Sequence, residues 1–380
     1  MKSHSCISAS ILSAAILGLF CAPGFLSGQA GSPAASPTSK SASSAKEPAK
    51  AEPGKTAAVP RTADGRPDLH GYWTNLSFTP MERPAKFQGR EFLTEQEMQE
   101  VYKAGLQVTF EGTPAEGIEG FGELYNPGSV DYDVNTYALS PWQNGIRPNR
   151  RSSLVVDPPD GRIPPLTAEA KARPRLRTGF SYVEDDHHGG GIVHADIPWD
   201  LGTNTTCISM NSGPPILPAE YNSNLLIVQS PGHLAIEREV GSEVRVIPID
   251  DRPHVSSSIR QWHGDARGHW EGDTLVVEST NFRPEAVYRN ANPRTLKITE
   301  RFTRIDQNTI EYKFTVDDPT TWTKPWSAVV PMSRIKGPIF EYACSEDNND
   351  AVNILAGARA AEKAAQEKAK GGSSSPISQK

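Results

Sequence analysis

The feature that most constrains the fold is a series of short segments between residues 225 and 343 in which apolar and polar residues alternate. Such a period of two is typical of β-strands that bury one face. In residues 309–316 every second side chain is large and apolar, and those between are Thr, Glu or Lys. The predicted strands are Leu225–Gln229, Leu234–Arg238, Val244–Ile249, Thr274–Ser279, Leu296–Arg304, Thr309–Val316, Trp326–Met332 and Ile339–Ala343.

Short links containing Asp, Asn, Gly or Pro join most of these strands, as at 306–308. Local hairpins of this kind build an antiparallel meander, and about eight strands can close into a barrel around one small ligand. We therefore predict a mainly β protein, an antiparallel meander that forms a lipocalin-like β-barrel. A curved open sheet or a sandwich is the competing arrangement.

The part before this core, residues 61–200, is predicted to be irregular and to carry one short helix. Gly71–Thr74 and Ser153–Val156 are its two short predicted strands. Thr94 is expected to cap a helix that continues through Tyr102, because Glu97 stands three residues later and completes a capping box. Residues 201–358 form the predicted antiparallel β-rich core, and residues 359–380 a helical to disordered tail.

The N-terminal residues predict export. Lys2 and His4 precede the apolar run Ile7–Phe25, and small residues follow at 28–30. This is typical of a signal peptide, residues 1–30, that is cleaved near Ala30. Residues 31–60, rich in Ala, Ser, Pro and Lys, lack the apolar side chains needed to fold and predict a disordered linker. The mature chain is expected to be periplasmic or secreted.

Net charge and hydropathy limit the classes of binding partner that we expect. The net charge is −6 and the pI is about 5.9, and no long basic stripe is present, so we expect no nucleic-acid partner. No later segment approaches the ~18 consecutive apolar residues of a membrane-spanning helix. Neither a cofactor nor a metal is predicted, and the expected partner is a small-molecule ligand or substrate. The oligomeric state is left open.

Two cysteines, Cys207 and Cys344, remain after the predicted cleavage. In an oxidising compartment two lone cysteines most simply form a disulfide. Two buried free thiols are the alternative.

The segment 252–282 carries most of the chemistry-bearing side chains, including His254, His263 and His269. In a functional interpretation Asp265 orients a histidine and an arginine holds an anionic group. In a structural interpretation, Gly-Asp pairs form hairpin turns and the tryptophans cap the barrel end. The candidate ligand-binding residues in this segment are Arg260, Trp262, Arg267 and Trp270.

Glu300 falls on the apolar face of its predicted strand. An unpaired carboxylate there costs several kcal/mol, so Glu300 requires a partner such as an inward-facing arginine, or a polar cavity. Glu237 and Arg245 on neighbouring strands are the candidates. A buried structural ion pair is the simpler alternative.

A run at 185–196 holds His187, His188 and His194 among aspartates. Such density is compatible with a divalent metal, but three consecutive glycines leave the loop without a preformed geometry. No metal is therefore predicted.

Several segments together resemble a family of largely uncharacterised secreted proteins abundant in acidobacteria and other soil bacteria. They include ADGRPDLHGYWTN, RRSSLVVDPPDGRIPPLT, GPPILPAEYNSNLLIVQSPG, IRQWHGDARGHWEGDTLVVESTNF and EYACSEDN. The resemblance implies a secreted single-module protein in which Cys207 and Cys344 are family features, and it brings no established activity. Relatives can carry an apolar residue in place of His263, so His254 and Asp265 are the better candidates.

Three functional hypotheses follow. The first is a barrel that binds a small, partly apolar ligand. The second is a hydrolase, lyase or hydratase acting on a small organic or carbohydrate-derived substrate. Its candidate catalytic residues are His254 as acid or base, Asp265 as the group that orients it, and Glu300 as a second carboxylate. The third is an envelope scaffold, which a fully packed lumen would favour. The sequence leaves open whether the protein is an enzyme.

Overall fold

The computed structural model describes residues 59–111, 146–173, 196–210, 213–218, 223–286, 288–346 and 348–371. Every described residue lies in one compact unit, Lys55–Lys380. The predicted signal peptide, almost all of the predicted linker and the histidine-rich run at 185–195 lie outside the described residues.

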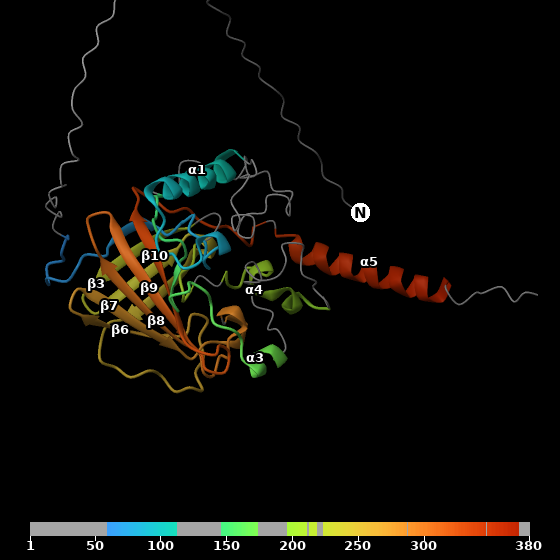
Figure 1. Ribbon diagram of the computed structural model, residues 1–380. Helices are drawn as coiled ribbons and strands as arrows, with labels where there is room; N and C mark the ends of the chain where they lie inside the picture. The colour runs from blue at the N-terminus through green and yellow to red at the C-terminus, as the bar shows by residue number, and fades with distance from the viewer. Residues whose placement is uncertain are drawn as a thin grey trace, which may run out of the picture. The chain divides into compact units, whose positions relative to one another are not determined.

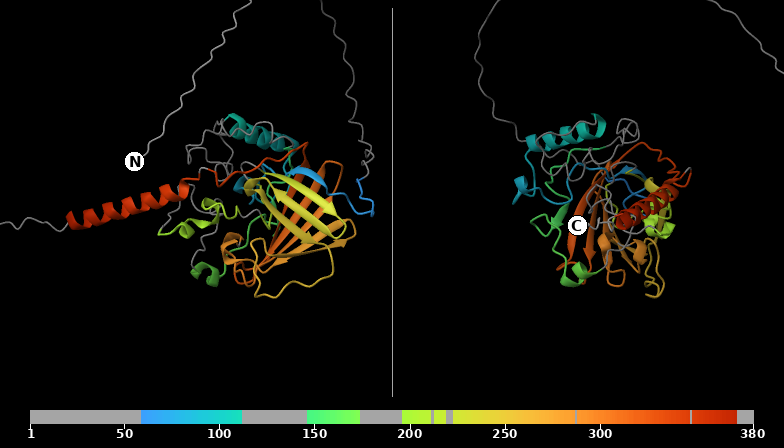
Figure 2. Two further views of the ribbon diagram at one scale, coloured as in Figure 1. Left: turned by 180° about the vertical axis from the view of Figure 1, so that it is seen from behind. Right: turned by 90° about the vertical axis from the view of Figure 1, so that its right-hand side faces the viewer.

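Ten strands form one sheet in the order β5-β4-β3-β1-β10-β9-β8-β7-β6, with β2 paired to β10 off this path. All of these strand pairs are antiparallel. The sheet curls into a nearly closed barrel, which confirms the predicted fold (Figures 1 and 2). The strands are β1 (Gly71–Thr74), β2 (Val155–Asp157), β3 (Asn224–Ser230), β4 (His233–Arg238), β5 (Glu243–Pro248), β6 (Asp265–Glu271), β7 (Thr274–Thr280), β8 (Lys297–Arg304), β9 (Thr309–Asp317) and β10 (Trp326–Arg334).

The two ends of the sheet, β5 and β6, meet at a seam. A single parallel bridge joins Ile249 to Gly268 across it. A Cβ atom added at Gly268 would lie 3.3 Å from Cγ1 of Ile249 and 3.4 Å from Cγ2 of Ile247. The absence of a side chain at Gly268 therefore lets the two edges approach closely enough to bring the barrel near closure.

Side chains fill the centre of the barrel. Alternation along each strand turns one set of residues inward, and in β9 every second residue is buried. A side chain with no accessible surface lines no void large enough for a water molecule, so the central lumen is packed as a hydrophobic core. The inward residues without accessible surface include Leu225, Ile227, Leu234, Ile247, Leu275, Val277, Ile298, Phe302, Ile310, Phe314, Val316, Ala328, Val330 and Met332.

The two ends of the barrel are closed differently. At one end, which we call the base, the Arg304 guanidinium lies 5.3 Å from the ring centroid of Trp73 and donates to backbone oxygens of Asp68, Asp306 and Gln307. At the opposite end, the mouth, β7 and β9 finish and β8 and β10 begin. There the residues Gly213–Pro218, which we call the cover segment, contact side chains that project from the barrel.

The helices lie outside the barrel, and α5 extends away from it (Figure 1). The predicted capping box is confirmed, because Glu97 N–H donates to Thr94 Oγ1 at 3.2 Å and Thr94 N–H to Glu97 Oε2 at 2.8 Å. That helix runs past the predicted end at Tyr102. The helices are α1 (Glu95–Glu111), α3 (Ala168–Ala172), α4 (Gly202–Thr205) and α5 (Asp350–Gly371), with short 3-10 turns η1 (Ala85–Phe87), η4 (Pro198–Leu201), η5 (Val240–Ser242), η6 (Pro284–Ala286) and η7 (Tyr288–Asn290).

Two predictions of secondary structure were wrong. The sequence predicted turns where the structure has strand β6. The pattern was missed because the inward positions are Ala266, Gly268 and Trp270, and only the last is large. The predicted strand Ile339–Ala343 is not a strand, and Phe340 within it is half exposed. It has no neighbouring strand with which to pair.

The predicted disulfide between Cys207 and Cys344 is confirmed, with a Cα–Cα distance of 5.6 Å and a sequence separation of 137 residues. It joins the turn after α4 to the segment before α5. Among the described helices, none has the length and apolarity needed to cross a membrane.

Candidate functional site at the barrel mouth

Two arginines, a glutamate and a tyrosine project into the barrel interior near the mouth. On β4, Arg238 follows the inward residues Leu234 and Ile236 with a spacing of two. Arg245 on β5 pairs in register with Ile236 and therefore also points inward. The other two are Glu300 on β8 and Tyr312 on β9, both without accessible surface.

Arg245, Glu300 and Tyr312 form a connected group, which we call the paired layer, and of its polar side-chain atoms only Arg245 Nε has no hydrogen-bond partner among the described residues. The Arg245 guanidinium donates to both carboxylate oxygens of Glu300, at 3.0 and 2.6 Å, and the Tyr312 hydroxyl donates to Glu300 Oε1 at 2.9 Å. Burial, reinforced by the Glu300 carboxylate, raises the pKa of Tyr312 well above its usual value. Burial lowers the pKa of Arg245, but the charge and hydrogen bonds of Glu300 outweigh this and raise it overall. The layer therefore holds a neutral phenol and an ion pair.

The expectation that Glu300 pairs with an inward arginine is confirmed, and the arginine is Arg245. Glu237, the other predicted member, does not join the layer. It stands one position away from Ile236 and Arg238 on β4, and strand alternation places it on the outer face of the sheet.

Arg238 differs from Arg245 because its charge is not paired. Its side chain is buried, with 2% exposed, yet only Nη2 makes a hydrogen bond, to Leu217 O at 2.7 Å. Nε and Nη1 have no hydrogen-bond partner. Burial lowers the pKa of Arg238 to about 10, against the opposing charge of Glu243. Since a buried donor left unpaired costs about 1–3 kcal/mol, more for a charged group, Arg238 is an expensive residue for the fold alone.

The cover segment lies on these side chains and meets them through its backbone. Ile216 N–H donates to the Tyr312 hydroxyl at 2.9 Å, and His263 Nδ1 lies 2.9 Å from Gly213 O. Asn75 donates to Ile216 O at 3.4 Å. The Ile216 and Leu217 side chains are almost fully buried. The cover segment thus fills the mouth with two apolar side chains and offers Arg238 one neutral carbonyl.

His263 is more deeply placed than the sequence suggested. Its Nε2 is 3.9 Å from Glu243 Oε1, and burial lowers its pKa. It therefore favours the neutral form, in which it bonds the cover segment.

An aromatic series leads from the paired layer to the mouth. The ring centroids of Tyr312 and Phe314 are 5.8 Å apart, and those of Phe314 and Trp326 are 5.7 Å apart in an edge-to-face arrangement. Trp322 and Tyr288 each lie 6.0 Å from Trp326. Such rings provide a large apolar surface with defined orientation, and Tyr312 at its inner end is close enough to Arg238 to interact with it electrostatically.

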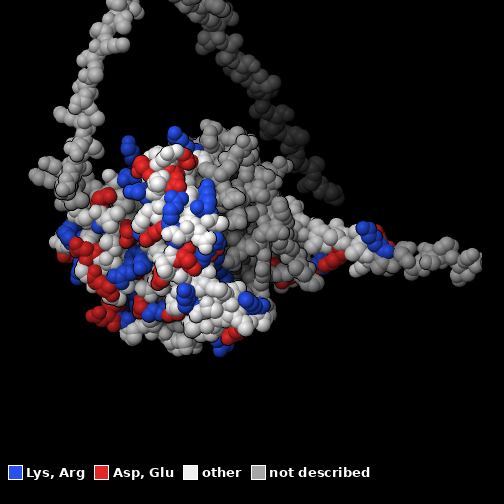
Figure 3. Space-filling view, viewed as in Figure 1, with Lys and Arg blue, Asp and Glu red and all other residues white. Residues whose placement is uncertain are grey.

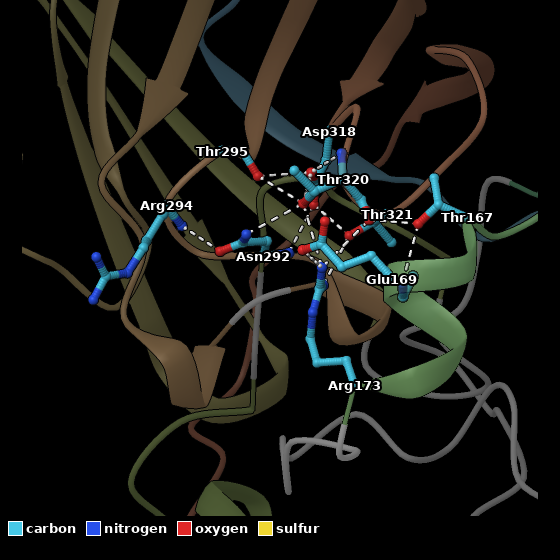
Figure 4. Close-up of polar contacts among 10 residues, drawn as sticks. Thr167, Glu169, Arg173, Asn292, Arg294, Thr295, Asp318, Thr320 and Thr321 are labelled. Carbon is cyan, nitrogen blue, oxygen red and sulfur yellow. Dashed lines mark hydrogen bonds and ion pairs between the residues drawn. The ribbon is translucent and has the colours of Figure 1, made fainter.

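Asp318 organises the rim of the mouth (Figure 4). Its carboxylate accepts hydrogen bonds from Thr295 at 2.7 Å, Thr321 at 2.5 Å and the Asn292 backbone N–H at 2.7 Å. Thr320 adds two more. Burial raises the pKa of Asp318, but these hydrogen bonds outweigh it and lower the pKa overall. The loop before β8 and the turn carrying Trp322 are therefore held together through one carboxylate.

His254 and Asp265 form the close pair that the functional interpretation requires, but on the other face of the sheet. His254 Nδ1 lies 2.8 Å from Asp265 Oδ2, which also accepts from Val255 N–H at 2.9 Å. Arg267 pairs with Asp265 Oδ1 at 2.9 Å. Ala266 and Gly268 point inward, so Asp265 and Arg267 point outward. Glu300 points inward. Glu300 and His254 therefore lie on opposite faces of the sheet and do not face the same ligand.

The remaining candidates from this segment hold loops or lie at surfaces. Arg260 donates to Phe282 O and Pro293 O, at 3.1 and 2.5 Å. Trp262 lies 4.5 Å below the Arg283 guanidinium, and Trp270 lies 5.5 Å from that of Arg66. None of these contacts involves Arg238 or the paired layer.

Arg238, Tyr312 and the cover segment were missed as site residues. The alternation that exposed Glu300 applied equally to Arg238, two positions after Ile236, and to Tyr312 between Ile310 and Phe314. No comparable signal marks the cover segment, because its role depends on contacts between residues far apart in the chain.

Positive and negative side chains are mingled over the face shown in Figure 3, so the informative charges are the buried ones. Comparison with protein-family models finds no match, and comparisons with curated proteins and with solved structures find none either. The family resemblance of the sequence therefore stays a prediction.

Proposed function

We propose that the protein binds a small, partly apolar molecule carrying an anionic group, with that group at Arg238 in the barrel mouth. The observation that carries this proposal is the pair of unpartnered donors, Nε and Nη1, on a guanidinium with 2% of its surface exposed. A carboxylate accepts two parallel hydrogen bonds from a guanidinium, which a single neutral carbonyl does not.

The cover segment supports the apolar part of the ligand. Because the central lumen is packed, a ligand has room only where the segment's own Ile216 and Leu217 side chains now lie. A ligand would displace them, replace the Leu217 carbonyl at Arg238 and pack against the aromatic series. The proposed site lies at the mouth of the barrel. In the structure the cover segment occupies it.

We also propose that the protein acts in the periplasm or outside the cell. The Cys207–Cys344 disulfide and the apolar run at residues 7–25 support this. Sequencing the N-terminus of protein recovered from the periplasm or medium tests it, with a start near residue 31 expected. Recovery of the intact chain in the cytoplasm alone would contradict it.

A matched pair of probes tests the ligand proposal. Calorimetric titration with cinnamate and with cinnamamide compares two molecules of nearly equal shape, of which only the first is anionic. We expect cinnamate to bind at least tenfold more tightly, since charge-assisted hydrogen bonds are about twice as strong as neutral ones. Arg238→Met should abolish this preference.

Arg301→Met is the matched control, because Arg301 lies on the outer face of β8, where it pairs with Glu271 at 2.8 Å. It should leave cinnamate binding unchanged. Equal affinity for the acid and the amide, or a preference that survives Arg238→Met, would overturn the proposal.

A second candidate function is acid–base catalysis on the outer face, favoured by the 2.8 Å contact between His254 and Asp265. His254 Nε2 makes no hydrogen bond to the described residues, and the side chain is partly exposed. A hydrolase, lyase or hydratase would use that nitrogen as base. Hydrolysis of p-nitrophenyl acetate tests the hydrolase case, and a rate equal in wild type and His254→Gln would contradict it.

A further inference from the structure

Further buried polar atoms at the mouth have no hydrogen-bond partner among the described residues, and two of them lie on the strands β7 and β10. They are Oγ of Ser279 on β7 and Nε1 of Trp326 on β10, and neither residue has any exposed surface. They lie in one row of the barrel wall. Ser279 pairs in register with Ile298, Ile298 with Val316, and Val316 with Trp326. Both side chains belong to the inward set at the mouth end.

Two pairs of hydroxyls on neighbouring strands exchange hydrogen bonds, which makes the contrast informative. Thr315 and Ser327 exchange a hydrogen bond of 2.8 Å between β9 and β10, and Thr274 and Thr303 do the same between β7 and β8. Alanine in place of Ser279 would fill nearly the same volume, and phenylalanine in place of Trp326 would keep an aromatic ring, in each case without an unpaired polar atom. The fold alone therefore does not account for the hydroxyl and the indole N–H.

We propose that these two atoms form a second subsite, which binds a hydroxyl or carbonyl group at the end of the ligand opposite its anionic group. The indole N–H is a donor only, so the ligand group must accept, while the serine hydroxyl donates or accepts. The aromatic series runs from Tyr312 through Phe314 to Trp326, and in this proposal the apolar part of the ligand packs along it once the cover segment is displaced. The ligand class is thus an aromatic carboxylate with a distal oxygen. The inference rests on the proposed function and deepens it.

The test compares cinnamate with 4-hydroxycinnamate, which differ only by the distal hydroxyl. In wild type the hydroxylated acid should bind about fivefold to tenfold more tightly, the gain expected for one or two net hydrogen bonds. In Ser279→Ala this gain should fall towards one, while the affinity for cinnamate itself changes less than about twofold. In Trp326→Phe the gain should also fall towards one, and it is judged as the ratio of the two affinities, because Trp326 belongs to the aromatic series that contacts both acids. Calorimetry on the full chain measures all six affinities.

The outcomes separate this inference from the proposed function. If cinnamate binds and depends on Arg238 but the hydroxyl brings no gain, or the gain survives in both variants, the subsite alone is overturned. If neither acid binds, both proposals fall. Thermal unfolding supplies a second readout, because removing an unpaired buried hydroxyl should leave the melting temperature of Ser279→Ala equal to that of wild type or higher. A clear fall would show that Ser279 has a structural partner and would also overturn the subsite.

Discussion

The paired layer and the mouth lie a few residues apart in the same barrel. They differ in how well their buried polar atoms are paired by hydrogen bonds. In the paired layer, the Glu300 carboxylate accepts two hydrogen bonds from the Arg245 guanidinium and one from the Tyr312 hydroxyl, and only Arg245 Nε is left without a partner in the described part of the chain. At the mouth, Arg238, Ser279 and Trp326 each retain polar atoms without a partner. Buried polar groups are normally hydrogen-bonded, and those that are not call for an explanation. The difference separates the part of the interior that serves the fold from the part that we assign to a ligand.

The largest expected effect comes from breaking the paired layer. Arg245→Met should lower the free energy of unfolding by about 3–5 kcal/mol, because it leaves Glu300 as an uncompensated buried charge. Urea denaturation followed by tryptophan fluorescence measures it.

The double variant Arg245→Met with Glu300→Leu is its control. Replacing both charges with apolar residues removes the uncompensated charge, so most of the lost stability should return. If the double variant were as unstable as the single one, the loss of stability would not come from the uncompensated charge of Glu300.

The disulfide lies close in sequence to the cover segment, since Cys207 is six residues before that segment begins. Replacing Cys207 and Cys344 together with serine should cost about 2–4 kcal/mol, through the greater freedom of the unfolded chain. Thermal unfolding with and without a reducing agent measures it. The reductant should destabilise wild type and leave the double variant unchanged; an equal effect on both would contradict the assignment.

The Asp318 carboxylate at the mouth accepts several hydrogen bonds, in contrast to the unpaired atoms of the mouth. It gives a pH-dependent prediction. Because its pKa is lowered in the fold, it stabilises the protein above the unfolded carboxyl pKa of about 4, and this contribution is lost as the pH falls through the lower folded value. Asp318→Asn should therefore cost about 2 kcal/mol at neutral pH, the scale of one or two charge-assisted hydrogen bonds, and progressively less below pH 4.

Urea denaturation at several pH values measures this difference. Glu169, exposed and paired with Arg173 at 3.2 Å beside the same cluster, provides the control variant Glu169→Gln, which should stay close to wild type. A constant deficit for Asp318→Asn across the pH range would contradict the account.

Period two in the sequence was enough to predict the barrel and the inward direction of Glu300, because both depend on local alternation. Strand β6 escaped because Ala266 and Gly268 give its inward face little apolar signal, and Gly268 is small for a reason that only the seam reveals. The His254–Asp265 contact follows from proximity in the chain, whereas its separation from Glu300 depends on which face of β6 each side chain takes. The cover segment reaches Arg238, His263 and Tyr312 by tertiary contacts that no local pattern encodes.

The most direct test of the central claim is Arg238→Met, assayed for both stability and cinnamate binding in one preparation. An arginine retained for a ligand contributes little to the fold, and an apolar residue of similar length removes an unpaired buried charge. We predict a free energy of unfolding within about 1 kcal/mol of wild type or above it, together with loss of the preference for cinnamate over cinnamamide. A loss of stability comparable to that of Arg245→Met, with the preference for cinnamate intact, would contradict it.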